Sequence, residues 1–157
     1  MGLKMIVLDL FCGTKSIANA FEAKGHTVYT VDWDKQFNPS LVADIGKLTA
    51  QDIIKLCGGA PDVIWASPDC TTYSVAAIST HRYTVTYCQY GERRQKPTDI
   101  WTNHPAPQFK LPCKRGAPCH DAAPRGAKTG TQSLKNRIEK AKIPVLLCQH
   151  IVEICKK

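Results

Sequence analysis

Apolar positions in the first half of the chain follow the rhythm of a layered α/β protein. Residues 5–10 form an apolar run typical of a strand buried on both faces, and residues 26–32 and 63–66 add two further strand-like runs. Between these runs, residues 16–24 and 49–56 place apolar side chains at helical spacing, and glycines close both segments. This alternation predicts an α/β fold of the Rossmann-like class, with the opening of a doubly wound parallel sheet.

The rhythm ends after Thr72. Residues 75–81 are too few for a crossover helix before the alternating run at residues 83–90, because a parallel crossover needs about a dozen residues or more. We therefore expect either that residues 83–90 run antiparallel or that a segment is missing near Ser79–Tyr83. Residues 100–103 are the candidate for the last strand.

The remainder of the chain is irregular and basic. Residues 104–137 are rich in proline, glycine, cysteine, histidine and basic residues, with almost no periodicity, and long loops of this kind are usually functional or metal-tied. Pro144 begins an amphipathic run. The expected organisation is an α/β core (1–103), a basic recognition loop (104–137) and a closing helix packed on the core (138–157).

Composition and charge refine this picture. The 157 residues suit one ordinary domain. Residues 1–81 hold 6 basic and 8 acidic side chains, a net charge of −2, whereas residues 82–157 hold 15 and 5, a net charge of +10. The second half therefore suits a polyanion such as DNA, the alternative being solvated lysines around a loop.

The sequence also predicts the compartment. No apolar run near the start approaches the roughly 20 residues of a membrane span, and no signal peptide is visible. The 8 cysteines are scattered through strand-like and helix-like segments. We therefore expect reduced thiols in a cytoplasmic protein, with no membrane partner.

The first candidate site follows the first two strands. A glycine at the end of the first strand allows close backbone approach to a ligand, and an acid at the end of the second strand, about 20 residues later, commonly binds a ribose hydroxyl. A nucleotide-like ligand is predicted, against the alternative of an ordinary turn beside a solvated acid. No Gly-x-Gly-x-x-Gly or complete phosphate-binding loop is present, so ATP hydrolysis is not expected. The candidate contacts are Asp9, Phe11, Cys12, Gly13, Asp32, Asp44 and Ile45.

Cys70 follows the third strand and is a candidate nucleophile. A cysteine on a strand-end turn can be exposed and activated, although a lone cysteine is more often packed in a core. The charge of the neighbouring Asp69 would raise the thiol pKa, so activation would require a compensating cation.

In this order, the motifs resemble those of S-adenosylmethionine-dependent DNA cytosine-5 methyltransferases, and most closely the small phage and prophage type. The resemblance extends over nearly the whole chain. A later stretch resembles the arginine-bearing segment of that family. The matching segments are Asp9–Gly13, Asp32, Asp44-Ile45, Asp62–Cys70 with the run Pro68–Ser74, Gln89–Thr98 and Trp101–Asn103.

The resemblance implies an abbreviated methyltransferase fold, S-adenosylmethionine as cofactor and DNA as partner, with residues 1–103 carrying cofactor binding and catalysis. It also implies a bacterial or phage-infected cell as the location. Pro68 joins the implied cofactor contacts. The Cys70 thiolate would add to carbon 6 of a flipped-out cytosine, carbon 5 would then take the methyl group, and elimination would release the enzyme. Arg93 or Arg94 would hold the base edge.

The chain departs from the family pattern in three places. Lys15 stands where the family has a second glycine, and Asp69 replaces a proline before the cysteine. No glutamate occurs between Glu22 and Glu92, so the family's base-binding glutamate is absent. A stretch missing between about Ser79 and Tyr83 would explain this absence. A chain that lacks it should transfer methyl groups weakly or not at all while still binding cofactor. The alternatives are an inactive S-adenosylmethionine- or nucleic-acid-binding homologue, or an RNA cytosine methyltransferase.

The basic loop holds a third candidate site. Cys113, Cys119 and His120, with His104 upstream, could hold Zn²⁺, although the spacing is not that of a standard finger and reduced loop cysteines are the alternative. The neighbouring basic side chains are the expected phosphate contacts. They are Lys96, Lys110, Lys114, Arg115, Arg125, Lys128, Lys135 and Arg137.

Overall fold

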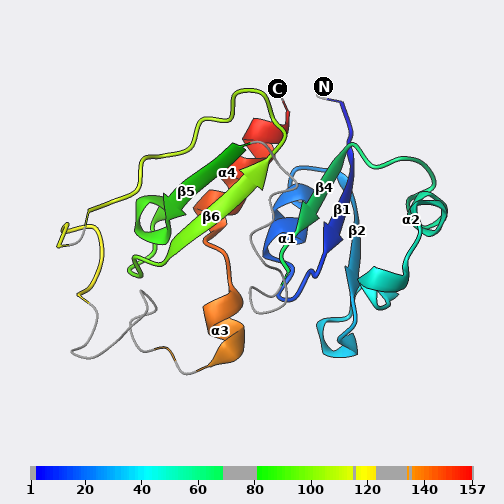
Figure 1. Ribbon diagram of the computed structural model, residues 1–157, viewed down its shortest axis with the longest axis horizontal. Coiled ribbons are helices and arrows are strands. Elements are labelled where there is room, and N and C mark those ends of the chain that lie inside the picture. Colours follow the sequence, from blue (N-terminus) through cyan, green and yellow to red (C-terminus); the bar gives the residue numbers. More distant parts are fainter. Residues whose placement is uncertain (1–2, 69–80, 115, 123–133, 135, 157) are drawn as a thin grey trace. The chain divides into compact units, whose positions relative to one another are not determined.

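The chain builds two separate sheets, one within residues 1–74 and one within residues 75–157, and each belongs to its own unit (Figure 1). The computed structural model describes residues 3–68, 81–114, 116–122, 134 and 136–156. The boundaries expected from sequence, at residues 103 and 137, stay predictions, as does the packing of the closing helix on the core.

The first unit is a four-stranded parallel sheet with strand order β3-β2-β1-β4. The predicted parallel α/β arrangement is thereby confirmed for its opening three strands and two helices. The short β3 and two 3-10 turns were not predicted. The elements are β1 (Ile6–Leu10), α1 (Ser16–Glu22), β2 (Thr27–Asp32), η1 (Lys35–Phe37), β3 (Leu41–Val42), η2 (Ile45–Lys47), α2 (Ala50–Cys57) and β4 (Val63–Ala66).

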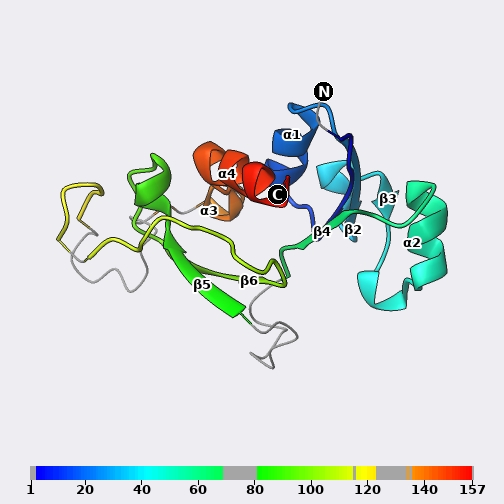
Figure 2. The same cartoon turned by 90° about the horizontal axis from the view of Figure 1, so that it is seen from above.

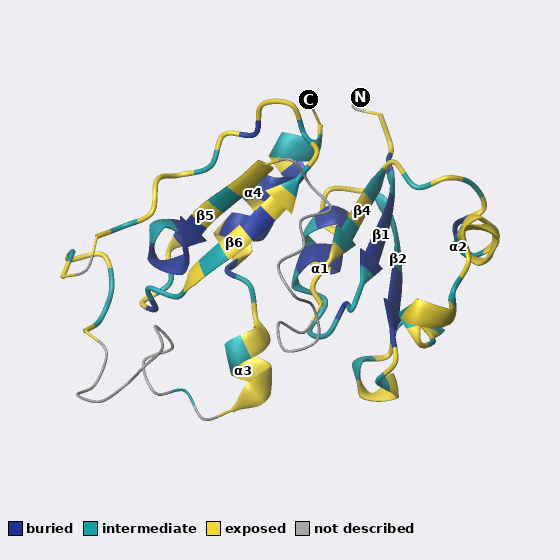
Figure 3. Ribbon diagram, in the orientation of Figure 1, coloured by how far each residue is buried: buried dark blue, intermediate teal, exposed yellow. Residues whose placement is uncertain are grey.

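Helices cover both faces of this sheet because successive side chains of a strand point to opposite faces. Leu8 of β1 packs with Val31 of β2 and Cys57 of α2 in one buried cluster. The next residue, Asp9, faces the other helix and accepts a hydrogen bond from the backbone N–H of Ala18 in α1 at 3.3 Å. Figure 2 shows α1 and α2 on opposite sides of the sheet, and Figure 3 shows that β1 and the inner side of α1 are buried.

The ends of α2 follow from local side-chain chemistry. Thr49 accepts a hydrogen bond from the backbone N–H of Asp52, and the Asp52 carboxylate accepts one from the backbone N–H of Thr49, which forms a capping box. Gly58 ends the helix at φ 71°, in the left-handed region that favours glycine.

The second unit pairs β5 (His81–Thr86) with β6 (Pro97–Thr102) in antiparallel register, which confirms the antiparallel alternative. The expected strand at residues 83–90 was wrong in its second half: residues 87–90 form the 3-10 turn η3 (Tyr87–Tyr90). Tyr87 and Tyr90 are buried with Cys88 between them, so this segment packs inward without pairing as a strand. The hypothesis of a missing segment near residues 79–83 stays a prediction, because residues 69–80 lie outside the described part.

Two helices complete the second unit, α3 (Arg137–Ala141) and α4 (Val145–Cys155). The predicted helix beginning at Pro144 is confirmed as α4. The additional short helix α3 begins at the last residue of the expected loop and lies mostly in the stretch 138–157 expected to be the closing helix. The buried side chains of α4 are Leu147, Cys148, Ile151 and Val152. Its His150 ring nitrogen Nδ1 lies 3.1 Å from the Tyr90 hydroxyl of η3. None of the helices in the described residues is long and apolar enough to span a membrane.

We predict that Leu8→Ala lowers the free energy of unfolding of the first unit by about 2–5 kcal/mol, because it leaves a cavity at the centre of the sheet. Leu3→Ala is the matched control: Leu3 is 87% exposed, whereas Leu8 is 1% exposed. The control should change stability by less than about 0.5 kcal/mol. Urea unfolding followed by circular dichroism measures both, and equal losses would contradict this account of the core.

Candidate cofactor crevice and candidate metal centre

The carboxyl ends of β1, β2 and β4 lie at one edge of the first sheet because the strands are parallel. Beyond the strands, the backbone N–H of Cys12 donates to the carbonyl of Val31, and that of Ser67 donates to the carbonyl of Leu10. The chain leaves β1 toward β2 on one side and returns through β4 on the other. In open α/β sheets, ligands bind at the edge where the strand order reverses in this way.

Asp32 closes β2 and holds the turn that follows β1. Its carboxylate oxygens accept hydrogen bonds from the backbone N–H groups of Gly13 and Asp34, each at 3.0 Å, and the residue is 5% exposed. Two of the predicted cofactor contacts, Gly13 and Asp32, therefore meet directly. This carboxylate fixes the shape of the turn as well as offering its remaining lone pairs to a ligand.

In the turn after β1, several residues have backbone dihedral angles in the left-handed region. Phe11, Gly13 and Lys15 have φ values of 55°, 44° and 54°. For a residue with a Cβ this region costs on the order of 1 kcal/mol, so glycine is the preferred residue there. Lys15 therefore occupies a position that favours glycine. Its ammonium donates a hydrogen bond to the carbonyl of Asn38.

Asp9 is the most deeply buried acid of the edge, at 2% exposure. Burial raises the pKa of its carboxyl from 3.8 to about 7, the Ala18 N–H lowers it, and the negative charge of Asp32 raises it further. Burial and the neighbouring carboxylates also raise the pKa of the Cys12 thiol to about 11. Cys12 is therefore a neutral packing residue of the crevice and a poor nucleophile at neutral pH.

The other predicted contacts of the crevice have different surroundings. Asp44 is exposed, accepts the Gly46 N–H at 3.1 Å and so caps η2, while Ile45 packs against the buried cluster around Leu8. The backbone N–H of Ala43 donates to the carbonyl of Asp32, which keeps this segment beside the end of β2. Pro68 is exposed after β4, and the predicted nucleophile Cys70 lies outside the described residues.

The raised pKa of Asp9 predicts a pH dependence of stability. The folded chain keeps this proton up to about pH 7, whereas the unfolded chain loses it near 3.8. The Asp9 contribution is therefore fully present below pH 4 and is lost as the pH rises to about 7. Since each pKa unit corresponds to about 1.4 kcal/mol, Asp9→Asn should gain on the order of 4 kcal/mol relative to the natural chain between pH 4 and pH 8.

Urea unfolding at several pH values measures this difference. Glu22→Gln, at an exposed position of α1, is the matched control and should track the natural chain at every pH. A stability difference between Asp9→Asn and the natural chain that did not change with pH would contradict the assignment.

The two predicted catalytic arginines have different environments. Arg94 is 8% exposed, forms an ion pair with Glu92, and donates to the carbonyls of Glu139 at 3.2 Å and Lys142 at 3.4 Å. Its guanidinium also lies over the Tyr87 ring, 5.5 Å from the ring centroid. The hydrogen bonds to Glu92 raise its pKa further, so Arg94 is a permanently charged tie between η3 and the end of α3.

Arg93 points to the surface, with a side chain that is 83% exposed. It forms a two-pronged ion pair with Asp121, whose backbone N–H donates to the Arg93 carbonyl at 2.9 Å. These hydrogen bonds raise the pKa of Arg93 and lower that of Asp121. Of the two arginines, Arg93 presents its guanidinium to solvent.

Two of the expected phosphate contacts make contacts within the chain. Lys96 donates to the Lys140 carbonyl at 2.7 Å and lies 4.9 Å from the Tyr87 ring centroid. Lys110 donates to the Gln89 carbonyl at 2.9 Å. Lys114 and Arg137 are exposed. The remaining expected contacts lie outside the described residues; they are Arg115, Arg125, Lys128 and Lys135.

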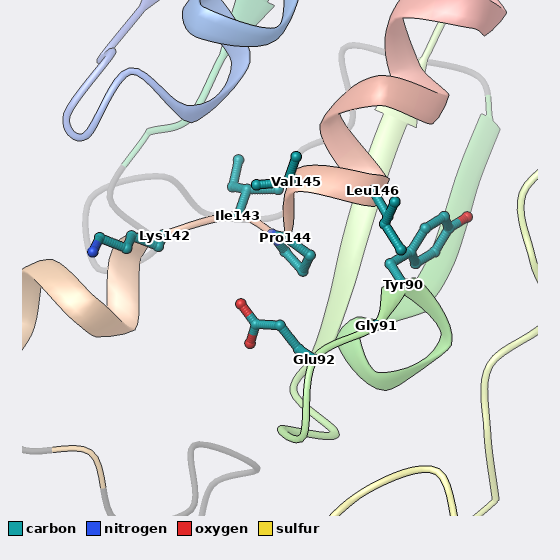
Figure 4. Close-up of a pocket in the computed structure, with 8 residues that line it drawn as sticks. All are labelled: Tyr90, Gly91, Glu92, Lys142, Ile143, Pro144, Val145 and Leu146. Carbon is teal, nitrogen blue, oxygen red and sulfur yellow. The ribbon is translucent and has the colours of Figure 1, made fainter.

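A cavity of about 320 Å³ lies in the second unit between the end of η3 and the start of α4. Figure 4 shows Tyr90, Gly91 and Glu92 on one side of it and residues 142–146, at the start of α4, on the other. Most of these side chains are apolar, so the cavity offers mainly packing surface. Its two charged lining residues are already paired, Glu92 with Arg94 and Lys142 with Glu139.

Four potential metal ligands meet in the second unit. Cys88, Cys113, Cys119 and His120 each place one ligand atom so that all four atoms lie within 4.8 Å of one another. The cluster could hold a metal such as zinc. The predicted ligands Cys113, Cys119 and His120 are thus brought together, but the suggested upstream partner His104 is not among them; its Nδ1 accepts the Ala106 N–H at 3.2 Å.

The sequence analysis missed Cys88. It lies 25 residues before Cys113, in a segment expected to be a strand, where a buried cysteine is read as core. The basic loop offered only three cysteine or histidine ligands. This incomplete set could have indicated that a fourth ligand comes from a neighbouring turn. Burial raises the pKa of the Cys88 thiol to about 12. Burial also opposes ionisation of Cys113, but hydrogen bonds led by the one from Cys88 lower its pKa overall.

No protein family, curated protein or solved structure matches this chain.

Proposed function

We propose that the chain is a DNA cytosine-5 methyltransferase that uses S-adenosylmethionine. One observation carries the proposal: Asp9, Gly13 and Asp32 meet at the carboxyl edge of a parallel sheet, at the point where the strand order reverses. The same residues begin the series of motifs that resembles this enzyme family.

The crevice suits a cofactor of this kind. Asp32, with Asp44 close by, would accept hydrogen bonds from the ribose and adenine ends, and the backbone turn at Phe11–Gly13 would lie against the methionine part. When bound, the cofactor supplies an electrophilic methyl group on a sulfonium. Lys15, in the position that favours glycine, should narrow the crevice at its methionine end.

Cys70 would carry the covalent step. Its thiolate forms a bond to carbon 6 of cytosine, and the electron pair of the 5,6 double bond moves to make carbon 5 nucleophilic. Carbon 5 takes the methyl group as its bond to the sulfonium sulfur breaks and leaves a neutral thioether. Carbon 5 then loses its proton to water, the 5,6 double bond re-forms and the thiolate leaves. The base must lie outside the DNA stack for this attack. By the resemblance, a cationic arginine would then hold the edge of the flipped base.

We assign that cation to Arg93 rather than Arg94. Arg94 is buried and engaged by Glu92 and two carbonyl groups, whereas Arg93 is exposed and paired only with an exposed acid in the described contacts. A base or phosphate can compete for an exposed guanidinium at small cost, but displacing Arg94 would leave the partly buried Glu92 without its ion-pair partner.

An inactive cofactor- or DNA-binding homologue is the second candidate. The absence of any glutamate between Glu22 and Glu92 favours it, since the family uses such a residue to hold the cytosine ring. The same crevice and the same basic surface would then serve binding without methyl transfer.

Covalent trapping separates the two candidates. With S-adenosylmethionine and DNA containing 5-fluorocytosine, the active enzyme should form a stable protein–DNA adduct, because fluorine prevents the final elimination. We expect the adduct with the natural chain and with Cys155→Ser, and its loss in Cys70→Ser, read on denaturing gels. DNA binding without an adduct in the natural chain would support the inactive homologue. Adducts on 5-fluorocytosine RNA but not DNA would indicate an RNA enzyme.

The two arginines should separate in a second experiment. Arg93→Ala is expected to weaken DNA binding about tenfold, as loss of a base contact does, while thermal stability hardly changes. Arg94→Ala is expected to lower the free energy of unfolding by about 3 kcal/mol, because it leaves Glu92 unpaired. Fluorescence anisotropy and thermal denaturation measure the two effects. The reverse pattern would return the base-holding role to Arg94.

A further inference from the structure

We propose that Cys88, Cys113, Cys119 and His120 bind one Zn²⁺ ion in a closed tetrahedral site that fixes the basic segment 103–122 to the turn η3. This inference goes beyond the methyltransferase proposal and does not depend on it.

The distances between the ligand atoms fit zinc. The Sγ atoms of Cys88 and Cys119 lie 3.6 Å apart, and the His120 Nδ1 lies 3.6 Å from each of the Cys113 and Cys119 sulfur atoms. Tetrahedral zinc with bonds of about 2.3 Å to sulfur and 2.0–2.1 Å to nitrogen separates its ligands by about 3.8 Å for two sulfurs and 3.6 Å for sulfur and nitrogen. The Sγ atoms of Cys88 and Cys113, 3.1 Å apart, need to separate by less than about 1 Å.

Hydrogen-bond donors already surround the sulfur atoms. The side-chain amide of Gln89 donates to Cys119 at 3.5 Å, and that of Gln95 donates to Cys113 at 3.4 Å. Three thiolates around Zn²⁺ leave a net charge of −1, and such donors stabilise it. The site therefore has an outer layer as well as four ligands.

The segment that supplies three of the ligands has little else to hold it. Within its described residues, 103–114 and 116–122, Pro107 is the only buried residue, and no helix or strand is present. It passes beside η3, as Figures 1 and 2 both show, and the Cys113 N–H donates to the buried Thr86 hydroxyl at 3.0 Å. Long irregular segments without a core need such ties, and four protein ligands with no open position are typical of structural zinc.

The metal would also fix Asp121, which follows His120 directly and holds Arg93. Zinc binding would thus set the position of the exposed guanidinium. This consequence alone rests on the proposed function.

Metal analysis of the full-length chain tests the site. After production with added zinc and dialysis without chelator, we expect about one zinc per chain in the natural protein and in the matched controls His104→Ala and Cys155→Ser. His120→Ala and Cys113→Ser should fall to a small fraction of that. Zinc well below stoichiometry in the natural chain, or equal zinc in Cys113→Ser, would overturn the proposal.

Two further measurements keep the test decisive if a variant fails to fold. Cobalt-exchanged natural chain should show tetrahedral ligand-field bands and thiolate charge-transfer absorption, and His120→Cys should keep the metal with stronger charge transfer. A spectrum of octahedral cobalt would contradict the closed tetrahedral site. An intact mass lower by two hydrogens, with no metal bound, would indicate a disulfide in place of the zinc site. Neither readout involves methyl transfer, so failure of the proposed function leaves both intact.

Discussion

Burial of β1 on both faces and pairing along both edges is the constraint on which the first unit depends. Its neighbours β2 and β4 run parallel to it, so the segments that follow all three strands reach the same edge. Because Asp9 lies inside this strand, its carboxyl is almost fully buried, and burial raises its pKa to about 7. The strand Ile6–Leu10 therefore contributes both to the hydrophobic core and, through Asp9, to the charge at the carboxyl edge of the sheet.

The second unit depends on different contacts. A two-stranded sheet is too small to hold a basic segment of this length in place. Polar contacts there add to a small hydrophobic core that includes Tyr90 of η3 and Leu147 of α4. Arg94 and Lys96 donate to carbonyls at the end of α3, which satisfies backbone groups that a helix leaves unpaired. The proposed zinc site would add a further tie through Cys88 of η3. Arg94 and Lys96, two of the basic residues of this half, therefore make contacts within the unit.

Sequence patterns predicted the first unit well because a strand buried on both faces is written as a continuous apolar run, as in residues 5–10. The second unit was harder to predict. Residues 83–90 alternate like a strand, but burial of Tyr87 and Tyr90 in η3 decides their conformation, and this depends on α4, some 60 residues later. Cys88 was missed for the same reason, since ligand spacing is readable only when the ligands lie near one another in sequence. The roles of adjacent Arg93 and Arg94 differ through burial, which no local pattern records.

Arg94 has a consequence for the chain as it leaves the ribosome. The first sheet has all its strands once residue 66 has emerged, so it can form while the rest is still being made. Arg94 meets its carbonyl partners only after residues 139–142 have been added, 45 to 48 residues further on. Until then the Arg94 guanidinium, which is buried in the folded unit, stays hydrated. The order of synthesis therefore places this arginine contact later than the pairing of the strands in the first sheet.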